Sequence, residues 1–307
     1  MLGKTQEINT DYGRIEVTLL EDSVMLTGYR GKDISLTIPE LIENKPVTVI
    51  GKKAFLGAKS LQELYLPESI TEIQEWAFAS CSSLVKLSLP RKKLAVGQGI
   101  LKDCVKLEQI VVTEDSNSLI KPEPEGTSHL LAAVMNKLDA FYLFDTVAAG
   151  SRQWLEQWDA RMMSLMAQED TEGFSKMLLC GEEDYGSREN NLDYYVEQRK
   201  RFKVRLAMLR LMYDDALREE VKKSLLSYLR AHTKGESSEE TWKVVLEEHG
   251  DDKKYYQFLL DCECITGENI NAVLEDMGER HTEMKAFLMN CQGTQMKKED
   301  AFAGLEW

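Results

Sequence analysis

Apolar residues recur every twenty-three positions between Val47 and Val112. Three copies of the pattern follow one another, and the first two copies end in an L-x-L-P segment. A fixed period of this length is typical of a solenoid, in which each copy forms one turn stacked on the next. We therefore predict repeats at about 46–67, 68–90 and 91–113. The apolar positions that match between copies are Ile50/Ile73/Val96, Phe55/Phe78/Leu101, Leu61/Leu84/Leu107, Leu64/Leu87/Ile110 and Leu66/Leu89/Val112.

Each repeat contains two extended pieces. In the L-x-L segment, alternate side chains of a strand point to opposite sides, so the leucines face the core and the residues between them face solvent. The other piece runs into the dipeptides Ala54-Phe55 and Ala77-Phe78, whose rings we expect to stack in the core. The expected outward face of the strands is Glu63, Tyr65, Lys86, Ser88, Gln109 and Val111.

The segments before and after the repeats differ from them in pattern. Residues 1–38 hold the runs IEVTLL, SVMLTGY and DISLTIP, which predict strands that cover the first edge of the solenoid. Residues 113–127 are polar and contain Pro122, Pro124 and Gly126. Because such stretches mark linkers, we place a domain boundary there and divide the chain into domains 1–126 and 127–307.

From residue 128 onward the apolar spacing is helical. We expect one helix over LLAAVMNKLDAFYLFDTVAA that ends at Gly150, and then a helix capped by Ser151. That second helix carries Trp154, Trp158 and Met162 at helical spacing, which indicates a core stripe. Ser237-x-x-Glu240 predicts a capping box, and Asp251 or Asp252 is expected to cap the following helix. A shorter helix is expected over EGFSKMLLC, before Gly181. The remaining expected helices are 192–213, 215–232, 239–249, 253–264, 268–280 and 283–291, arranged in pairs as in an α-solenoid.

The repeat motif I-G/Q-x-x-A-F-x-x-C-x-x-L-x-x-L-x-L-P resembles the BspA-type leucine-rich repeat over roughly residues 20–113. The third copy departs from it, with Gly99-Ile100-Leu101 in place of the A-F segment, and Ala58 replaces the cysteine of the first copy. The expected fold class is α+β, with a short leucine-rich-repeat β-solenoid followed by an all-α, α-solenoid-like domain of unassigned family. The resemblance implies a protein that binds other proteins, often at the cell surface.

Charge and composition narrow the function classes. The formal net charge is −14, of which −3 lies in residues 1–126 and −11 in the remainder. This distribution argues against a nucleic-acid partner, because phosphate binding requires a positive surface. The N-terminus lacks the pattern of a signal peptide and no stretch is long and apolar enough to span a membrane, so we expect a cytoplasmic protein. A cell-surface location is the alternative that the resemblance implies.

Candidate chemistry is sparse in this sequence. His232 and His249 fall at expected helix C-termini, and Cys262-x-Cys264 lacks the spacing of a zinc site, so we interpret all of them as structural. The basic run at 199–203 is expected to be solvated or to contact acidic residues. We predict no catalytic residue, metal or cofactor, and a non-catalytic protein–protein interaction scaffold that uses the outward strand face. The alternatives are a small-ligand regulator or enzyme with a site in the helical domain, and a cell-surface adhesin.

Overall fold

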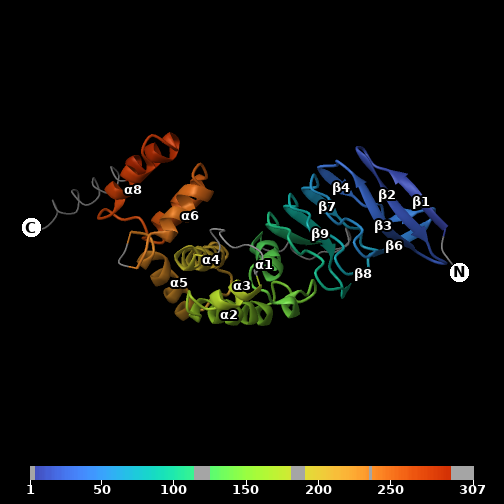
Figure 1. Cartoon of the computed structure of the whole chain (residues 1–307), viewed down its shortest axis with the longest axis horizontal. Coiled ribbons are helices and arrows are strands. Elements are labelled where there is room, and N and C mark those ends of the chain that lie inside the picture. Colours follow the sequence, from blue (N-terminus) through green and yellow to red (C-terminus); the bar gives the residue numbers. More distant parts are fainter. Residues whose placement is uncertain (1–3, 114–124, 181–190, 235–236, 292–307) are drawn as a thin grey trace, which may run out of the picture. The chain divides into compact units, whose positions relative to one another are not determined.

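The computed structural model of this chain describes residues 4–113, 125–180, 191–234 and 237–291 (Figure 1). The chain divides into two compact units. Unit 1 comprises Met1–Met162 with Tyr213–Ala216, and unit 2 comprises Met163–Met212 with Leu217–Trp307. The break between Met162 and Met163 falls within the helix Arg152–Ala167. The boundary predicted between residues 126 and 127 separates domains that fold on their own, which this division does not test, so it stays a prediction.

The first sheet of unit 1 begins antiparallel and continues parallel. Its strands follow the order β1-β2-β3-β6-β8-β10, and β5 pairs with β6. The antiparallel part covers the first edge of the solenoid, as the sequence predicts for the N-terminal segment. The strands are β1 (Lys4–Asn9), β2 (Gly13–Leu19), β3 (Val24–Gly31), β5 (Leu41–Ile42), β6 (Lys45–Ile50), β8 (Glu72–Ile73) and β10 (Ala95–Val96).

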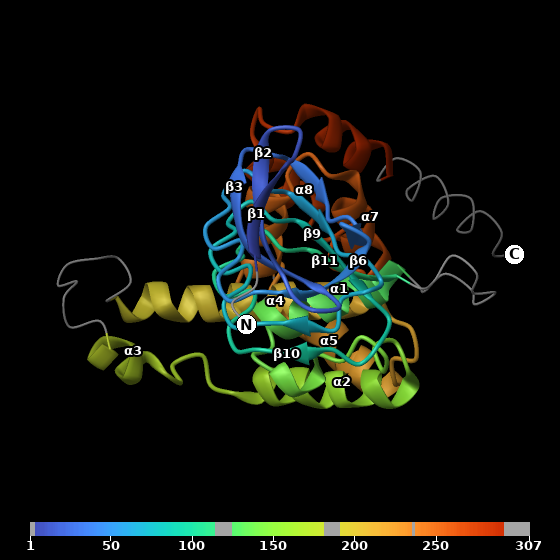
Figure 2. The ribbon, with the colours of Figure 1, turned by 90° about the vertical axis from the view of Figure 1, so that its right-hand side faces the viewer.

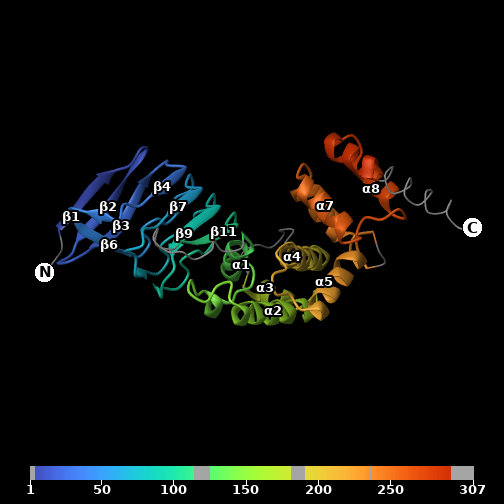
Figure 3. The ribbon, with the colours of Figure 1, turned by 180° about the vertical axis from the view of Figure 1, so that it is seen from behind.

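The second sheet contains four parallel strands in the order β11-β9-β7-β4. They are β4 (Ser35–Thr37), β7 (Glu63–Tyr65), β9 (Lys86–Pro90) and β11 (Gln109–Thr113). Figure 3 shows these strands following one another toward the helix α1 (Glu125–Asn136). The two sheets together form the solenoid, and the helical region follows it, so the predicted fold class is confirmed.

The solenoid has about four turns over residues 24–113, one more than the period of the sequence predicts. In the additional turn, Leu36 of β4 is the register partner of Leu64 in β7. These residues are 28 positions apart, whereas Leu64 and its partner Leu87 are 23 apart. The longer first turn breaks the fixed period, which is why a search for that period misses it.

The core of the solenoid lies between the two sheets. Of the fifteen predicted apolar positions, only Val96 is not buried, and it lies in the two-residue strand β10. The expected aromatic column is present, with ring centroids of Phe55 and Phe78 5.6 Å apart. Tyr29 extends this column at 5.3 Å from Phe55 and serves as its N-terminal end.

Each of the last three turns also contains two residues with a left-handed backbone, and these positions repeat with the same period. Trp76 (φ 61°) and Gly99 (φ 63°) occupy one of the positions. A Cβ on Gly99 would lie 3.2 Å from the ring of Trp76, so a glycine there lets the indole lie against the backbone of the next turn. The motif leaves this position variable, with Lys53, Trp76 and Gly99 in successive copies, and the glycine of the third copy suits the contact with Trp76.

The helix expected to run to Gly150 is shorter, and this prediction is wrong. α1 ends at Asn136, where the backbone N–H groups of Lys137 and Leu138 both donate to the carbonyl of Ala133. Asn136 instead donates from its side chain to the carbonyl of Leu107 at 2.7 Å, which ties this end of α1 to the last solenoid turn. Asp139 then takes a left-handed φ of 46°, and a short 3-10 helix follows at Phe141–Leu143.

The helix α2 (Arg152–Ala167) confirms the predicted core stripe. Ser151 accepts a hydrogen bond from the backbone N–H of Trp154 at 3.3 Å, which is the expected cap. The indole N–H of Trp154 donates to the carbonyl of Leu143, and that of Trp158 donates to the carbonyl of Leu130. Both indoles are buried and hydrogen-bonded, so they serve the packing of unit 1.

Unit 2 is helical. The six helices expected between residues 192 and 291 are present in the predicted order. Asp252 caps α7 by accepting from the N–H of Lys254, as expected. The predicted capping box at Ser237 is wrong, because the residue before the helix is Glu239 and Ser238 accepts from the N–H of Glu240. In the described part of the chain, no helix is long and apolar enough to cross a membrane.

Figure 2 shows α3 beside the first turns of α4. The tilted rings of Phe174 and Tyr195 join these two helices at 5.3 Å. The helices are α3 (Phe174–Cys180), α4 (Leu192–Met212), α5 (Glu219–Ala231), α6 (Glu240–Glu248), α7 (Lys253–Asp261), α8 (Ile270–Met277) and one at 282–291.

Candidate protein-binding face

The outward positions of the second sheet form two straight rows, which we call the strand face. The register places Ser35, Glu63, Lys86 and Gln109 side by side, and Thr37, Tyr65, Ser88 and Val111 in the neighbouring row. All six residues predicted from the sequence are therefore brought together. Ser35 and Thr37 belong to the additional turn and were not predicted, although Leu36-Thr37-Ile38-Pro39 repeats the alternation of Leu64-Tyr65-Leu66-Pro67.

Polar contacts connect the two rows around Tyr65. Its hydroxyl donates to Oε2 of Glu63 at 2.8 Å, and Oγ of Ser35 donates to the same oxygen at 3.4 Å. On the other side, Nζ of Lys86 lies 5.5 Å from the centre of the Tyr65 ring. The hydrogen bond to Glu63 raises the pKa of Tyr65, so the hydroxyl keeps its proton and remains a donor. The aromatic ring is thus held between an anion and a cation.

Ser88 lies in this face but is buried, with 3% of its surface exposed, so its predicted exposure is wrong. Its register neighbours are Tyr65 on β7 and Val111 on β11. The serine side chain is short, and larger neighbours on both sides exclude solvent from it. In this row, the side chain of Tyr65 is therefore more accessible to a partner than that of Ser88.

The C-terminal end of the strand face is partly occupied by α1. Nε2 of Gln109 lies 2.9 Å from Nε2 of His129, and the ring of His129 stacks on Tyr213 at 4.7 Å. Gln109 is therefore engaged by the chain itself. The open part of the face lies on β4, β7 and β9, where Ser35 and Thr37 are exposed and Glu63, Tyr65 and Lys86 are partly exposed.

Two large apolar side chains lie beside the open end of this face. Ile34 directly precedes β4 and is 61% exposed, and Tyr12 is 75% exposed. The carboxylate of Asp33 accepts a hydrogen bond from the backbone N–H of Tyr12 at 2.9 Å, and Ile34 follows Asp33 in sequence.

The same carboxylate holds the N-terminal strands together. Oδ2 of Asp33 accepts from the hydroxyls of Thr10 at 2.7 Å and of Tyr29 at 2.8 Å. Burial works against ionisation of Asp33, but these hydrogen bonds outweigh it and lower the pKa of the carboxyl. In return, burial and the hydrogen bond to Asp33 raise the pKa of Tyr29 to about 12. The sequence pattern gave no signal for this cluster, since its members lie up to 23 residues apart.

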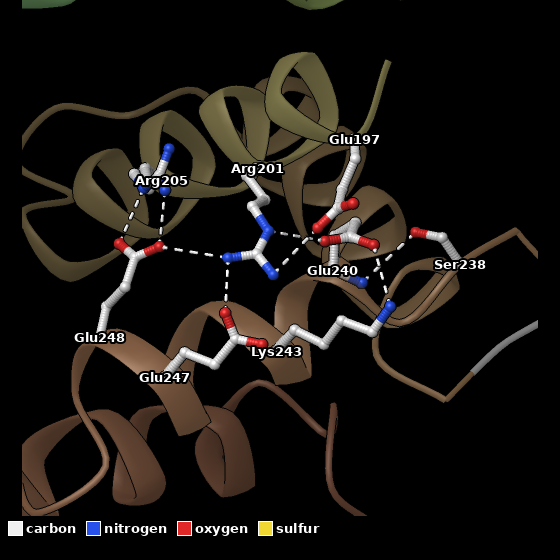
Figure 4. Close-up of polar contacts among 8 residues, drawn as sticks. All are labelled: Glu197, Arg201, Arg205, Ser238, Glu240, Lys243, Glu247 and Glu248. Carbon is white, nitrogen blue, oxygen red and sulfur yellow. Dashed lines mark hydrogen bonds and ion pairs between the residues drawn. The ribbon is translucent and has the colours of Figure 1, made fainter. Parts of the chain in front are cut away.

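The basic run of α4 is confirmed to contact acidic residues. Arg201 makes ion pairs with Glu197 at 3.1 Å, Glu240 at 3.1 Å and Glu247 at 2.7 Å (Figure 4). The hydrogen bond with Glu247 raises the pKa of Arg201 although burial opposes it. Arg205 adds a two-point contact to Glu248, at 2.8 Å and 2.6 Å. Every carboxylate in this cluster faces a cation, so the cluster joins α4 to α6 and offers no free group for catalysis.

The cysteines considered as ligands are packed in the core. Cys262 and Cys264 are buried, and burial raises the pKa of the Cys262 thiol to about 12. His232 and His249 both follow the last residue of a helix, as predicted. Among the described residues, no group of three or more His, Cys, Asp or Glu side chains is placed to hold a metal ion.

Comparison with known proteins places the repeats in a family. A family described as "BspA type Leucine rich repeat region" matches residues 34–123 with six copies. Solved structures of leucine-rich repeat proteins also match. One from T. pallidum has 31% identity over 34% of this chain and 50% of its own, with a TM-score of 0.31. No curated protein matches this sequence.

Two further structures match the same part of the chain. A leucine rich cell surface protein from Faecalibacterium prausnitzii has 24% identity over 36% of this chain and 32% of its own, with a TM-score of 0.29. A leucine-rich repeat protein from Bacteroides ovatus has 25% identity over 34% of this chain and 29% of its own, with a TM-score of 0.30. The chain thus spans half or less of each of these three relatives. Residues 34–123 are a BspA-type leucine-rich repeat region, and the helical region that follows is not assigned to a family.

Proposed function

We propose that this chain is a non-catalytic protein–protein interaction module, and that its partner binds the open part of the strand face. The observation that carries the proposal is the arrangement around Tyr65, whose ring is only partly buried and is flanked by Glu63 and Lys86. Leucine-rich repeat relatives favour a role in protein interaction or as a surface repeat protein. The repeats supply a rigid sheet, so little conformational entropy is lost on binding.

Tyrosine suits the centre of such a contact. Its ring buries a large area with few rotatable bonds, and its hydroxyl adds a polar end. Here the hydroxyl is already oriented by Glu63 and the ring by the neighbouring strands. The partner surface that fits is one with an apolar pocket for the ring, a cation near Glu63 and an anion near Lys86.

The helical region of unit 2 offers a second surface for the same scaffold role. An enzymatic or small-ligand site there is the alternative, and the Arg201 cluster gives it no support because its charges are already neutralised.

The cellular location of the protein is a separate question. We retain the expectation of a cytoplasmic protein, with the cell surface as the alternative, and protease treatment of intact cells of the source organism distinguishes the two.

The test compares two triple variants of the full chain. Glu63→Lys/Tyr65→Ala/Lys86→Glu changes the strand face. The control Lys52→Glu/Glu75→Lys/Tyr142→Ala makes the same kinds of change at an exposed ion pair and an exposed tyrosine elsewhere in unit 1. A partner captured from a lysate of the source organism is expected to be lost with the first variant and kept with the control. Equal retention by both folded variants would contradict the proposal.

A further inference from the structure

A cavity of about 470 Å³ lies in unit 1, between the last turn of the solenoid and the end of α1. Its volume falls within the range of about 300–1,000 Å³ that is usual for small-molecule sites. Apolar side chains form much of its wall, and three polar residues join them. The lining residues include Gln98, Leu101, Lys102, Met135, Asp139 and Phe141.

The cavity exists because the third repeat departs from the motif. Where the earlier turns carry Phe55 and Phe78, this turn carries the smaller Leu101, and Gly99 presents no side chain. On the opposite wall, Val134 and Ala140 are buried, while Phe141 keeps 47% of its surface exposed. The result is an apolar recess with an aromatic ring at its opening.

Two opposite charges border this recess without neutralising each other. Lys102 and Asp139 form no ion pair with each other or with any other residue that the structure describes. Nζ of Lys102 lies over the ring of Trp76 at 5.2 Å, which keeps this cation beside the recess. Asp139 follows the C-terminal end of α1, where the helix dipole also favours a positive group. Both residues are exposed at the rim of the recess, where Lys102 favours an anion and Asp139 favours a cation.

We propose that this cavity binds a free α-amino acid with an apolar side chain. Its carboxylate pairs with Lys102, and its ammonium group pairs with Asp139 at the carbonyl end of α1. Its side chain packs against Leu101, Met135 and Phe141. A zwitterion matches both charges at once, whereas a simple acid or amine leaves one of them unmatched. This site is separate from the strand face, so binding of an amino acid here does not depend on whether a protein partner binds there.

The test is calorimetric titration of the full chain with L-leucine and L-phenylalanine. Isoamylamine, which lacks the carboxylate, and N-acetyl-L-leucine, which lacks the ammonium group, are titrated alongside. The free amino acids are expected to bind, and each analogue is expected to bind at least about tenfold more weakly, since each loses one charge-assisted contact.

Matched variants locate the binding. Lys102→Met and Asp139→Asn are each expected to weaken binding of the amino acid by about tenfold or more. The controls are Lys106→Met and Asp103→Asn, which change exposed residues of the same turn outside the cavity. Asp103 also shares the left-handed backbone of Asp139, with φ of 60° against 46°, so it controls for strain. Absence of heat from every free amino acid would overturn the proposal, as would equal affinity in cavity variants and controls.

Discussion

The thiol of Cys104 donates a hydrogen bond to the backbone carbonyl of Phe78 at 3.1 Å, one solenoid turn earlier. Cys81 makes the same contact with Phe55, also at 3.1 Å. The cysteine of the repeat motif therefore links consecutive turns through the A-F segment. It acts as a small buried donor where the sheet hydrogen bonds do not reach.

Cysteine reactivity follows from this arrangement. The neighbouring Cys104 thiol and burial raise the pKa of Cys81, and burial raises that of Cys262 to about 12, so both are almost wholly protonated at neutral pH. Cys291 is partly exposed. Cys104 is buried too, so the reagent cannot reach it although the neighbouring Cys81 lowers its pKa. We expect iodoacetamide to modify Cys291 in the folded protein and to reach Cys81, Cys104 and Cys262 only in denaturant. Peptide mass spectrometry checks this order, and rapid modification of Cys104 in the folded chain would contradict it.

Asp33→Asn is expected to destabilise unit 1 by roughly 1–3 kcal/mol at neutral pH, the usual range for disrupting hydrogen bonds to a buried polar group. The pKa of Asp33 is lowered in the folded state, so its contribution is present above the unfolded pKa and is lost as pH falls through the folded pKa. Urea unfolding of both proteins at several pH values measures the difference. It should be largest at neutral pH and shrink below about pH 4. A difference that grows on acidification would show that the charge is not the cause.

Arg201→Met is expected to destabilise unit 2 by about 3 kcal/mol or more, because it leaves the buried carboxylate of Glu240 without its main cation. Arg205→Met serves as the control, since its ion pair is more exposed and should cost less than about 1 kcal/mol. Unfolding is followed by the intrinsic fluorescence of the five tryptophans, of which Trp242 is buried in α6. The double variant Arg201→Met/Glu240→Gln should recover part of the loss. Equal losses for the two arginine variants would contradict this account of the cluster.

Two glycines with similar backbone angles should respond differently to alanine. Gly57 has φ of 71° and nothing lies within 4 Å of its would-be Cβ, whereas at Gly99 the Cβ would meet the Trp76 ring. Both changes carry the backbone cost of a left-handed residue, about 1 kcal/mol. Gly99→Ala should add a steric cost and lower the melting temperature further than Gly57→Ala. Calorimetry compares the two, and the reverse order would exclude the role given to Trp76.

The local sequence pattern was sufficient to predict the repeats. It was not sufficient to predict contacts between residues that are distant in sequence. The spacing of Leu64, Leu87 and Ile110 predicted the register of three strands, because each turn repeats one steric environment. Leu36 escaped the same search since its turn is longer. The alternation rule placed Ser88 outward but could not show that Tyr65 and Val111 cover it.

Tertiary contacts decided the remaining differences. At the end of α1, the side chain of Asn136 bonds to the carbonyl of Leu107, a contact between distant residues that no local rule contains. Asp33 and Arg201 acquire their partners only after segments tens of residues apart come together. The charged rim of the cavity, Lys102 and Asp139, was hidden for the same reason, since the two residues lie on different elements.

The central claim, that a protein partner binds around Tyr65, is tested most directly by site-specific photo-crosslinking. p-Benzoyl-L-phenylalanine replaces Tyr65 in one protein and Tyr142, which is 70% exposed, in the control. Both proteins are irradiated in a lysate of the source organism. We expect a discrete crosslinked partner with the probe at position 65 that is absent at position 142 and lost when Glu63→Lys and Lys86→Glu are added. No specific crosslink at position 65, or the same product at both positions, would contradict the claim.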